Sequence, residues 1–314
     1  MSNKKLERRV ETLRQRTKIS PKGLISIIYG DMLVPHGGTV WLGSLVKLAG
    51  HFGIVEYLAR TSALRLVQDG WLHPTRIGKL SFYSMTEDHV ARVKKHYPRV
   101  YGQAFKDWSG TWYLLLAGVS GLDRKQLGTL WESLRWHGVG RLSPDIFISA
   151  AENIDAVDLL LQELDLREKV EVMRAESVLP KDENLLRGIV EKAWDIDNIA
   201  ALYEAFLARF RPFWLDLDQG LQLDGEHAFI LRALLISEYR AIVLQDPRLP
   251  KELLPEPWAG FKAFTLCKSL YQSLLPASEG FLREQVRTAD GPMGKAGDLL
   301  YQRFGGLAPI DDDR

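Results

Sequence analysis

The sequence predicts an α+β protein in which two domains that combine helices with strands precede a helical domain. A length of 314 residues exceeds what one hydrophobic core usually organises, so we expect two or three domains. The first third of the chain is basic and the remainder is acidic. Apolar residues recur at both strand and helix spacing before residue 180 and at helix spacing alone after it. The predicted segments are a basic N-terminal arm at 1–19, domains at 20–106, 107–178 and 179–306, and a tail at 307–314.

The composition argues against disorder, secretion and membrane insertion. Apolar residues make up 46% of the chain, which is enough to form a core. Cys267 is the single cysteine, so no internal disulfide or zinc cluster is expected and a reducing cytoplasm fits. The N-terminus lacks the pattern of a signal peptide, and the apolar runs are too short or too polar to span a bilayer. We expect a cytoplasmic protein with no membrane span, metal or cofactor.

The near-neutral net charge conceals an asymmetry. Residues 1–106 contain 18 Lys and Arg against 7 Asp and Glu, whereas the rest of the chain contains 23 against 33. Five of the seven histidines also lie in the basic segment. This pattern is expected when one domain faces a polyanion. A solvated basic surface without a partner would fit the charge equally well, so the local pattern has to decide.

The first domain contains the parts of a helix-turn-helix. A helix is predicted from Pro21 until the break at residues 35–38, and a second covers Trp41 to Ala49. Residues 50–53 contain two glycines and form a turn. A third helix follows from Ile54 to Val67, and two short helices across such a turn are typical of this motif. We expect its apolar positions to be buried: Val55, Leu58, Leu66 and Val67.

A β-hairpin is predicted directly after these helices. Residues 71–76 and 79–84 flank Ile77 and Gly78, and the second segment alternates apolar with polar side chains. A hairpin in this place is typical of the wing of a winged helix-turn-helix, whose tip contacts phosphates beside the major groove.

The third helix and the hairpin together supply candidate DNA contacts. Exposed Arg and hydroxyl side chains on a helix in the major groove can meet base edges, and cations on the hairpin can neutralise phosphates. Any one of these cations alone could equally be a solvated surface charge, but the conjunction with the basic domain favours DNA. The candidate DNA-binding residues are Glu56, Arg60, Thr61, Ser62, Arg65, Arg76, Lys79 and Ser81.

The middle domain has the element order of a ferredoxin-like fold. Strands are predicted at 111–119, 138–143, 145–150 and 169–175, with helices at 123–137 and 154–164. The order βαββαβ indicates that architecture and no particular function. An enzyme remains the alternative, namely a Mg²⁺-dependent nuclease that uses this domain, with Asp107, Asp123 and Asp145 as candidate ligands. These carboxylates fit caps or turns better than chelation. The GxSxG, GxxxxGK(S/T), HExxH and GxGxxG motifs do not occur, so we do not expect an enzyme.

The third domain is predicted to be all-helical. Its strongest helices cover residues 193–210, 229–244 and 263–275. On the second of these, Arg232, Tyr239 and Arg240 share one face. Two guanidinium groups on one face can clamp phosphates or a carboxylate, but ion pairs within this acidic domain explain them equally well.

Six stretches, in order from about Ser20 to Leu275, resemble the PaaX family of phenylacetate-catabolism repressors. They are HGGTVWLGSLVKLAG, IVEYLARTSALRLVQDGWL, WSGTWYLLL, GVGRLSPDIFIS, AWDIDNIAALYEAFLARFRP and LLISEYRAIVLQDPRLPKELLPEPWAG. The resemblance implies a transcriptional repressor that binds double-stranded operator DNA as a homodimer and is released by phenylacetyl-CoA. It makes 56–67 the recognition helix and 77–79 the wing tip. The chain departs from the family pattern at Ser237, where a histidine is expected, and at Pro257, where an acidic residue is expected.

An acyl-CoA effector needs an apolar pocket with a cationic mouth. Arginine and aromatic side chains occur together in the predicted helical domain, which is otherwise acidic. The candidate ligand-binding residues are Trp194, Arg211, Trp214, Arg232, Tyr239 and Arg240.

Overall fold

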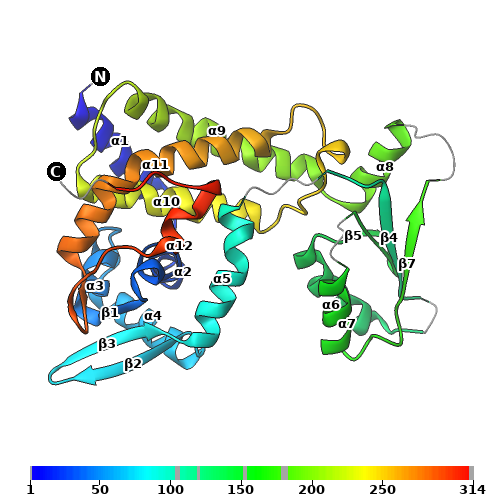
Figure 1. Ribbon diagram of the computed structural model, residues 1–314, viewed down its shortest axis with the longest axis horizontal. Helices are drawn as coiled ribbons and strands as arrows, with labels where there is room; N and C mark the ends of the chain where they lie inside the picture. Colours follow the sequence, from blue (N-terminus) through cyan, green and yellow to red (C-terminus); the bar gives the residue numbers. More distant parts are fainter. Residues whose placement is uncertain (1, 103–106, 119–120, 151–153, 178–182, 311–314) are drawn as a thin grey trace. The chain divides into compact units, whose positions relative to one another are not determined.

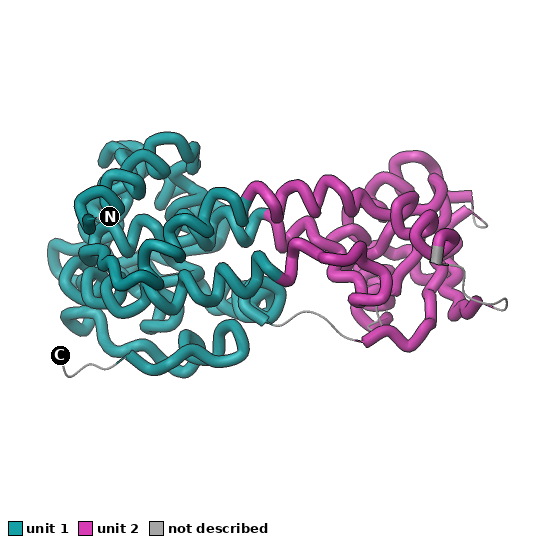
Figure 2. Tube along the Cα trace, turned by 90° about the horizontal axis from the view of Figure 1, so that it is seen from above, with its two compact units in different colours: residues 1–103, 206–241, 262–314 teal, residues 104–205, 242–261 magenta. Residues whose placement is uncertain are grey.

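The computed structural model describes residues 2–102, 107–118, 121–150, 154–177 and 183–310 and forms two compact units. Unit 1 comprises 1–103, 206–241 and 262–314, and unit 2 comprises 104–205 and 242–261 (Figure 2). The helical last third of the chain thus contributes residues to both units. The division of the chain into five segments, as expected from the sequence, stays a prediction.

The N-terminal segment of unit 1 is helical. Helix α1 covers Asn3–Arg16, and its Leu6 and Val10 are fully buried. Because apolar residues four positions apart lie on one helix face, the segment expected to be a basic arm packs into the unit. Helix α2 (Pro21–Ile27) begins where the sequence predicts and continues as a π-helical turn, Ile28–Leu33, and a short 3₁₀ turn, Val34–His36.

The two helices and the hairpin predicted next along the chain are all present. Strand β1 (Thr39–Trp41) leads into helix α3 (Leu42–Gly50), and helix α4 (Glu56–Gln68) follows after a turn. Strands β2 (Leu72–Ile77) and β3 (Leu80–Met85) form the hairpin. Strand β1, which we did not predict, pairs with β3, so that the antiparallel sheet has the order β1-β3-β2 (Figure 1).

Helix α5 (Glu87–Tyr101) leaves the hairpin and packs within unit 1. The last third of the chain is mainly helical, as expected. A short hairpin corrects the expectation of no strands after residue 180. The elements are α8 (Glu183–Ala193), α9 (Ile196–Asp218), α10 (Gly225–Val243), a 3₁₀ turn (Lys251–Leu253), α11 (Ala259–Gln285), β8 (Arg287–Thr288), β9 (Gly291–Pro292), α12 (Asp298–Tyr301) and a 3₁₀ turn (Arg303–Gly305).

The sheet of unit 2 follows the predicted βαββαβ order. Its elements are β4 (Thr111–Leu116), α6 (Arg124–Leu134) with a 3₁₀ turn (Arg135–His137), β5 (Gly140–Ser143), β6 (Ile146–Ser149), α7 (Asp155–Glu163) and β7 (Glu171–Glu176). The strand order is β5-β6-β4-β7, and all neighbours are antiparallel. Leu130 of α6 and Leu161 of α7 join Leu115 and Phe147 in one core, so both helices cover the same face of the sheet.

The first residue of the predicted tail, Leu307, is buried, and its N–H donates a hydrogen bond to the Tyr301 carbonyl at 2.8 Å. Residues 311–314 lie outside the described residues. Of the helices that the structure describes, none combines the length and the apolar character required for a bilayer crossing.

Candidate functional site

Helix α4 buries a stripe of small residues. Ala59, Ser62, Ala63 and Leu66 follow the i, i+3, i+4, i+7 spacing of one helix face, and α4 packs against α2 and α3. Our expectation that Ser62 is available to DNA is wrong, because only 7% of it is exposed. Small side chains allow close packing of the helices, and they direct the larger residues outward.

The outer face of α4 combines charged with apolar side chains. Glu56, Arg60 and Arg65 are exposed as predicted, and Thr61 is half-buried. Val55 and Leu58, which the sequence led us to place in the core, are 60% and 44% exposed. The segment therefore also exposes four large apolar side chains: Val55, Tyr57, Leu58 and Leu64.

Local hydrogen bonds hold the polar residues of α4. The Arg60 guanidinium donates to the Glu56 carboxylate one helical turn before it, at 2.7 Å. The Thr61 hydroxyl donates to the Tyr57 carbonyl at 2.8 Å. An exposed ion pair of this kind contributes only about 0.3–0.5 kcal/mol, so Arg60 can exchange Glu56 for another acceptor at little cost.

The hairpin presents its cations at the tip. Arg76 and Lys79 are exposed, and the Arg76 side chain donates to the Gly78 carbonyl at 3.2 Å. Gly78 adopts a φ of +61°, a left-handed conformation that favours glycine in a tight turn. Ser81 is half-buried and lies opposite Arg76 in the β2–β3 register. Figure 1 shows the hairpin extending outward from the helices of unit 1.

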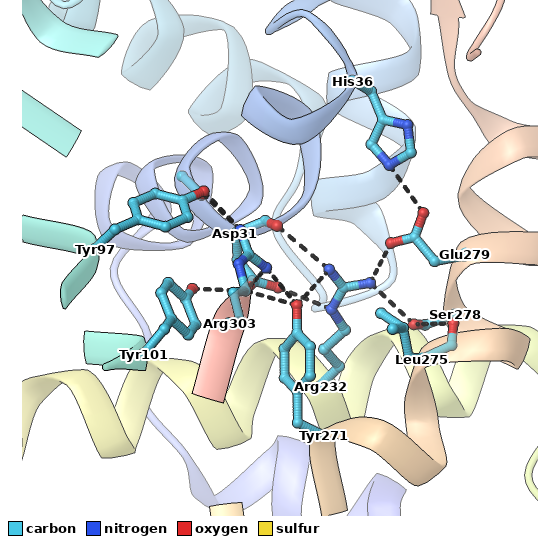
Figure 3. A network of polar contacts seen from close by, with 11 residues as sticks. Asp31, His36, Tyr97, Tyr101, Arg232, Tyr271, Leu275, Ser278, Glu279 and Arg303 are labelled. Carbon is cyan, nitrogen blue, oxygen red and sulfur yellow. Dashed lines mark hydrogen bonds and ion pairs between the residues drawn. The ribbon is translucent and has the colours of Figure 1, made fainter. Parts of the chain in front are cut away.

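A buried ionic network lies in the interior of unit 1 and is centred on Asp31 in the π-helical turn (Figure 3). One Asp31 carboxylate oxygen accepts a hydrogen bond from Arg232 at 2.8 Å, and the other accepts one from Arg303, also at 2.8 Å. The hydroxyls of Tyr101 and Tyr271 donate to the second oxygen as well, at 2.6 and 3.1 Å. The Asp31, Arg232 and Arg303 side chains are fully buried.

A second carboxylate completes the network. Arg232 also donates to Glu279 at 2.5 Å and to the Ser278 hydroxyl at 3.1 Å. The two ring nitrogens of His36 face Glu279 at 2.9 Å and the Gly294 carbonyl at 2.8 Å. Both partners are hydrogen-bond acceptors, so a ring nitrogen of His36 that carries a proton donates to the oxygen it faces.

The network joins segments that are distant in sequence. Its members come from the π-helical turn, α5, α10, α11 and the turn at 303–305. A buried ion is stable only when it is paired and hydrogen-bonded, so these segments have to meet in one arrangement. Sequence reasoning missed Asp31, Glu279 and Arg303. The available signal was a lone carboxylate inside the apolar run from Ile27 to Val34.

The structure does not bring the six candidate ligand residues together. Trp194 belongs to unit 2, where its indole N–H donates to the Gly138 carbonyl at 3.1 Å and its ring stacks on Trp112. Arg232 uses its guanidinium donors within the network, and Tyr239 is buried against Phe206.

The remaining three candidate ligand residues lie in unit 1. Arg211 is exposed on α9 and Trp214 is half-buried on the same helix. Arg240 is half-buried on α10 and lines a cavity. Of the six residues, Arg240 therefore lies where a small ligand can reach it.

The three carboxylates considered as Mg²⁺ ligands serve local structure. Asp107 forms an exposed ion pair with Lys251 at 2.6 Å. Asp123 caps α6 by accepting the Gln126 N–H at 2.8 Å, and Asp145 accepts the Ser143 hydroxyl at 2.8 Å. Within the part of the chain that the structure describes, no group of three His, Cys, Asp or Glu is placed to hold a metal ion.

These features define a mixed helix-and-sheet protein that presents a basic helix and hairpin on one of its compact units. Three family models match the chain in order. They are described as PaaX-like protein (residues 20–89), PaaX protein central Cas2-like domain (105–186) and PaaX-like protein C-terminal domain (194–284).

A named relative agrees with the family match. The transcriptional repressor PaaX of Escherichia coli (strain K12) is 37% identical over 304 residues, which cover 96% of each chain. The solved structure of the uncharacterized protein Rv0674 from Mycobacterium tuberculosis matches with a TM-score of 0.56 and 22% identity, over 81% of this chain and 97% of that one. At this identity the second likeness shows a shared fold alone. The chain belongs to the PaaX-like family, which confirms the resemblance found in the sequence.

We predict that Asp31→Ala lowers the free energy of unfolding by about 3–5 kcal/mol, because it leaves two buried guanidinium groups without their shared carboxylate. Asp69→Ala is the matched control, since Asp69 pairs with Lys22 at the surface and its loss should cost no more than about 1 kcal/mol. Urea denaturation measures both. Equal losses in the two variants would show that the network does not stabilise the fold.

The network also predicts a pH dependence of stability. Burial alone would raise the pKa of Glu279, but the Arg232 charge and the His36 hydrogen bond outweigh it and lower this pKa to about 2. The folded-state pKa thus lies below the unfolded value, so the stabilisation is complete above about pH 5 and is lost as the pH falls toward 2. We expect the stability gap between wild type and Glu279→Gln to shrink between about pH 6 and pH 3 in urea titrations. A gap that stays constant would contradict this assignment.

Proposed function

We propose that this chain is a cytoplasmic transcriptional repressor that binds double-stranded operator DNA through unit 1. Helices α3 and α4 act as a helix-turn-helix and the β2–β3 hairpin acts as its wing. The proposal rests on the difference between the buried and the exposed face of α4. Its small residues face the core, while Arg60 and Arg65 face solvent beside a hairpin with exposed Arg76 and Lys79. The near full-length similarity to a protein named as a transcriptional repressor supports it.

The exposed residues of α4 suit the major groove. A helix fits this groove, and an Arg side chain can donate two hydrogen bonds to guanine. Apolar side chains can contact thymine methyl groups, which gives a role to Val55, Tyr57 and Leu58 at the start of α4. On DNA, Arg60 exchanges its weak pair with Glu56 for a base edge. Arg65 and Thr61 are the other proposed contacts on this helix.

The hairpin and α5 fix the register on the duplex. Arg76 and Lys79 at the tip reach the phosphates beside the groove, with Ser81 as a further donor. The solvent side of α5 carries Lys94 and Lys95, which are exposed and extend the basic surface. Phosphate contacts supply affinity without reading sequence.

The family resemblance also implies a fold for the sheet domain, a dimeric state and an effector. The strand order of unit 2 supports a ferredoxin-like fold for its sheet domain. The active species is a homodimer that reads inverted half-sites about one helical turn apart, or a multiple of it. An aryl-CoA thioester such as phenylacetyl-CoA releases the DNA by binding the DNA-free conformation more tightly than the DNA-bound one.

Gel-shift and footprinting measurements with the promoter that adjoins its own gene test this function. We expect one retarded band, a protected inverted repeat and release on addition of phenylacetyl-CoA. The absence of protection in low salt would refute DNA binding. Cleavage of the labelled duplex in Mg²⁺ would favour a nuclease instead.

Two substitutions separate base reading from phosphate binding. We predict that Arg60→Ala weakens operator binding and relaxes sequence preference, with a loss of about 1–3 kcal/mol. Lys79→Ala should weaken specific and nonspecific DNA equally and reduce the slope of log affinity against log salt by about one. Competition gel shifts at several salt concentrations measure both effects. The assignment of α4 as the recognition helix is wrong if neither variant changes the preference.

A further inference from the structure

A cavity of about 230 Å³ lies within unit 1 beneath α5. Its lining comes from α2, the π-helical turn, both ends of the β2–β3 hairpin, α5 and α10. The α5 residues that line it recur at helical spacing from His89 to Tyr101, so one face of this helix forms a long wall. The DNA contacts that we propose on α4 and at the hairpin tip give this cavity no role.

Much of the cavity wall is apolar, and part of it is aromatic. Ile27, Val93 and Ile236 contribute aliphatic surface. Trp71, which precedes β2, stacks on His89 of α5, with ring centroids 3.9 Å apart and an angle of 25° between the planes. The Lys22 ammonium lies over the Trp71 ring, 5.4 Å from its centroid, so Trp71 offers a ligand its ring edge, which an aromatic ring can meet in a T-shaped contact.

Two guanidinium groups line the same cavity, Arg92 on α5 and Arg240 on α10. Burial lowers the pKa of His89, and the charges of Arg92 and Arg240 lower it further, so both cations act on the region around this ring. The carboxylate in the lining, Asp31, is already paired with Arg232 and Arg303. The remaining charge favours an anionic ligand.

The volume limits the ligand to a small group. A cavity of about 150 Å³ can hold benzene, so this one accommodates a single aromatic ring with a short side chain. A complete coenzyme does not fit within it. A thioester could place its acyl end inside while its coenzyme remains outside the cavity.

We propose that this cavity is the effector site, and that it takes a small aromatic carboxylate or the aryl-acyl end of a thioester. The ligand's ring lies against the edge of Trp71 and the aliphatic wall, and the ligand's carbonyl or carboxylate oxygens accept hydrogen bonds from Arg240 and Arg92. This assignment rests on the proposed function for its regulatory meaning, although the binding site itself stands on the geometry.

The position of the cavity explains how a ligand can act on DNA binding. On one side it contacts Trp71 and Met85, which lie at the base of the hairpin. On the other it contacts Asp31, Tyr97 and Tyr101 of the buried network. The network fixes the wall that includes the C-terminal part of α5, so a ligand that enters has to be accommodated by the N-terminal part of α5 and the base of the hairpin. A bound ligand thereby favours one arrangement of the hairpin and α5, the elements that carry the proposed phosphate contacts.

The sequence-based ligand set is revised accordingly. Arg240 stays in the site, whereas Arg232 lies behind it and holds the Asp31 wall in place. Arg92, Trp71 and Val93 enter the site from the segment that follows α4. Arg211 does not line the cavity, so it offers a matched control for the loss of an arginine in the same unit.

Isothermal titration with the full chain tests the site. The probes are phenylacetyl-CoA, phenylacetate and coenzyme A, each added to wild type, Arg240→Gln, Val93→Phe and Arg211→Gln. We expect wild type to bind phenylacetyl-CoA or phenylacetate, and the comparison of the two with coenzyme A identifies whether the acid or the thioester is the ligand. Arg240→Gln and Val93→Phe should weaken binding at least tenfold, by loss of a charged donor and by filling the cavity, while Arg211→Gln keeps wild-type affinity.

Operator binding by the same variants distinguishes the site from the proposed function. Retained gel shifts with reduced release by phenylacetyl-CoA show that Arg240→Gln and Val93→Phe are folded and act on the ligand. Unchanged ligand affinity in both variants, or no binding of any aromatic probe to wild type that still shifts DNA, overturns the cavity assignment alone. A third outcome is that wild type binds the ligand but no DNA, and that the two cavity variants lose ligand binding. This outcome keeps the cavity as a ligand site and refutes the repressor function.

Discussion

Unit 1 depends on the pairing of one buried carboxylate with two buried guanidinium groups. Asp31, Arg232 and Arg303 come from parts of the chain about 200 and 270 residues apart, and each would be costly to bury alone. Because their charges are satisfied only together, the early helices of the chain cannot adopt their positions without α10 and the C-terminal turn. The DNA-facing surface that we propose is thus built on residues from both ends of the sequence.

Unit 1 combines an exposed surface on α4 with a buried site beside the network. On the outer side, α4 uses Ala59 and Ala63 to approach its neighbours closely, which leaves its large and charged side chains in solvent. In the interior of the unit, residues of the network form one wall of a cavity that also contacts the base of the hairpin. The same arrangement therefore gives a basic surface for a polyanion and a small cationic pocket connected to it through α5.

The sequence predicted elements better than contacts. Helical and strand periodicity located α3, α4, the β2–β3 hairpin and the sheet of unit 2, because these patterns are local. It did not identify the inner face of α4, since Val55 and Leu58 are apolar and yet exposed, while Ser62 is polar and buried. For the same reason, periodicity did not show which of the candidate ligand residues lie near one another. A helical face places Arg232 near Arg240, but only the distant carboxylates Asp31 and Glu279 decide that Arg232 is an internal ion.

The most direct test of the account is hydrogen exchange of the full chain with and without its operator duplex. We expect protection on DNA binding in residues 56–68 and 72–85, while the amides of the π-helical turn at 28–33 exchange slowly in both states because the network holds them. Rapid exchange at 28–33 in the free protein, or protection confined to segments outside α4 and the hairpin, would contradict it.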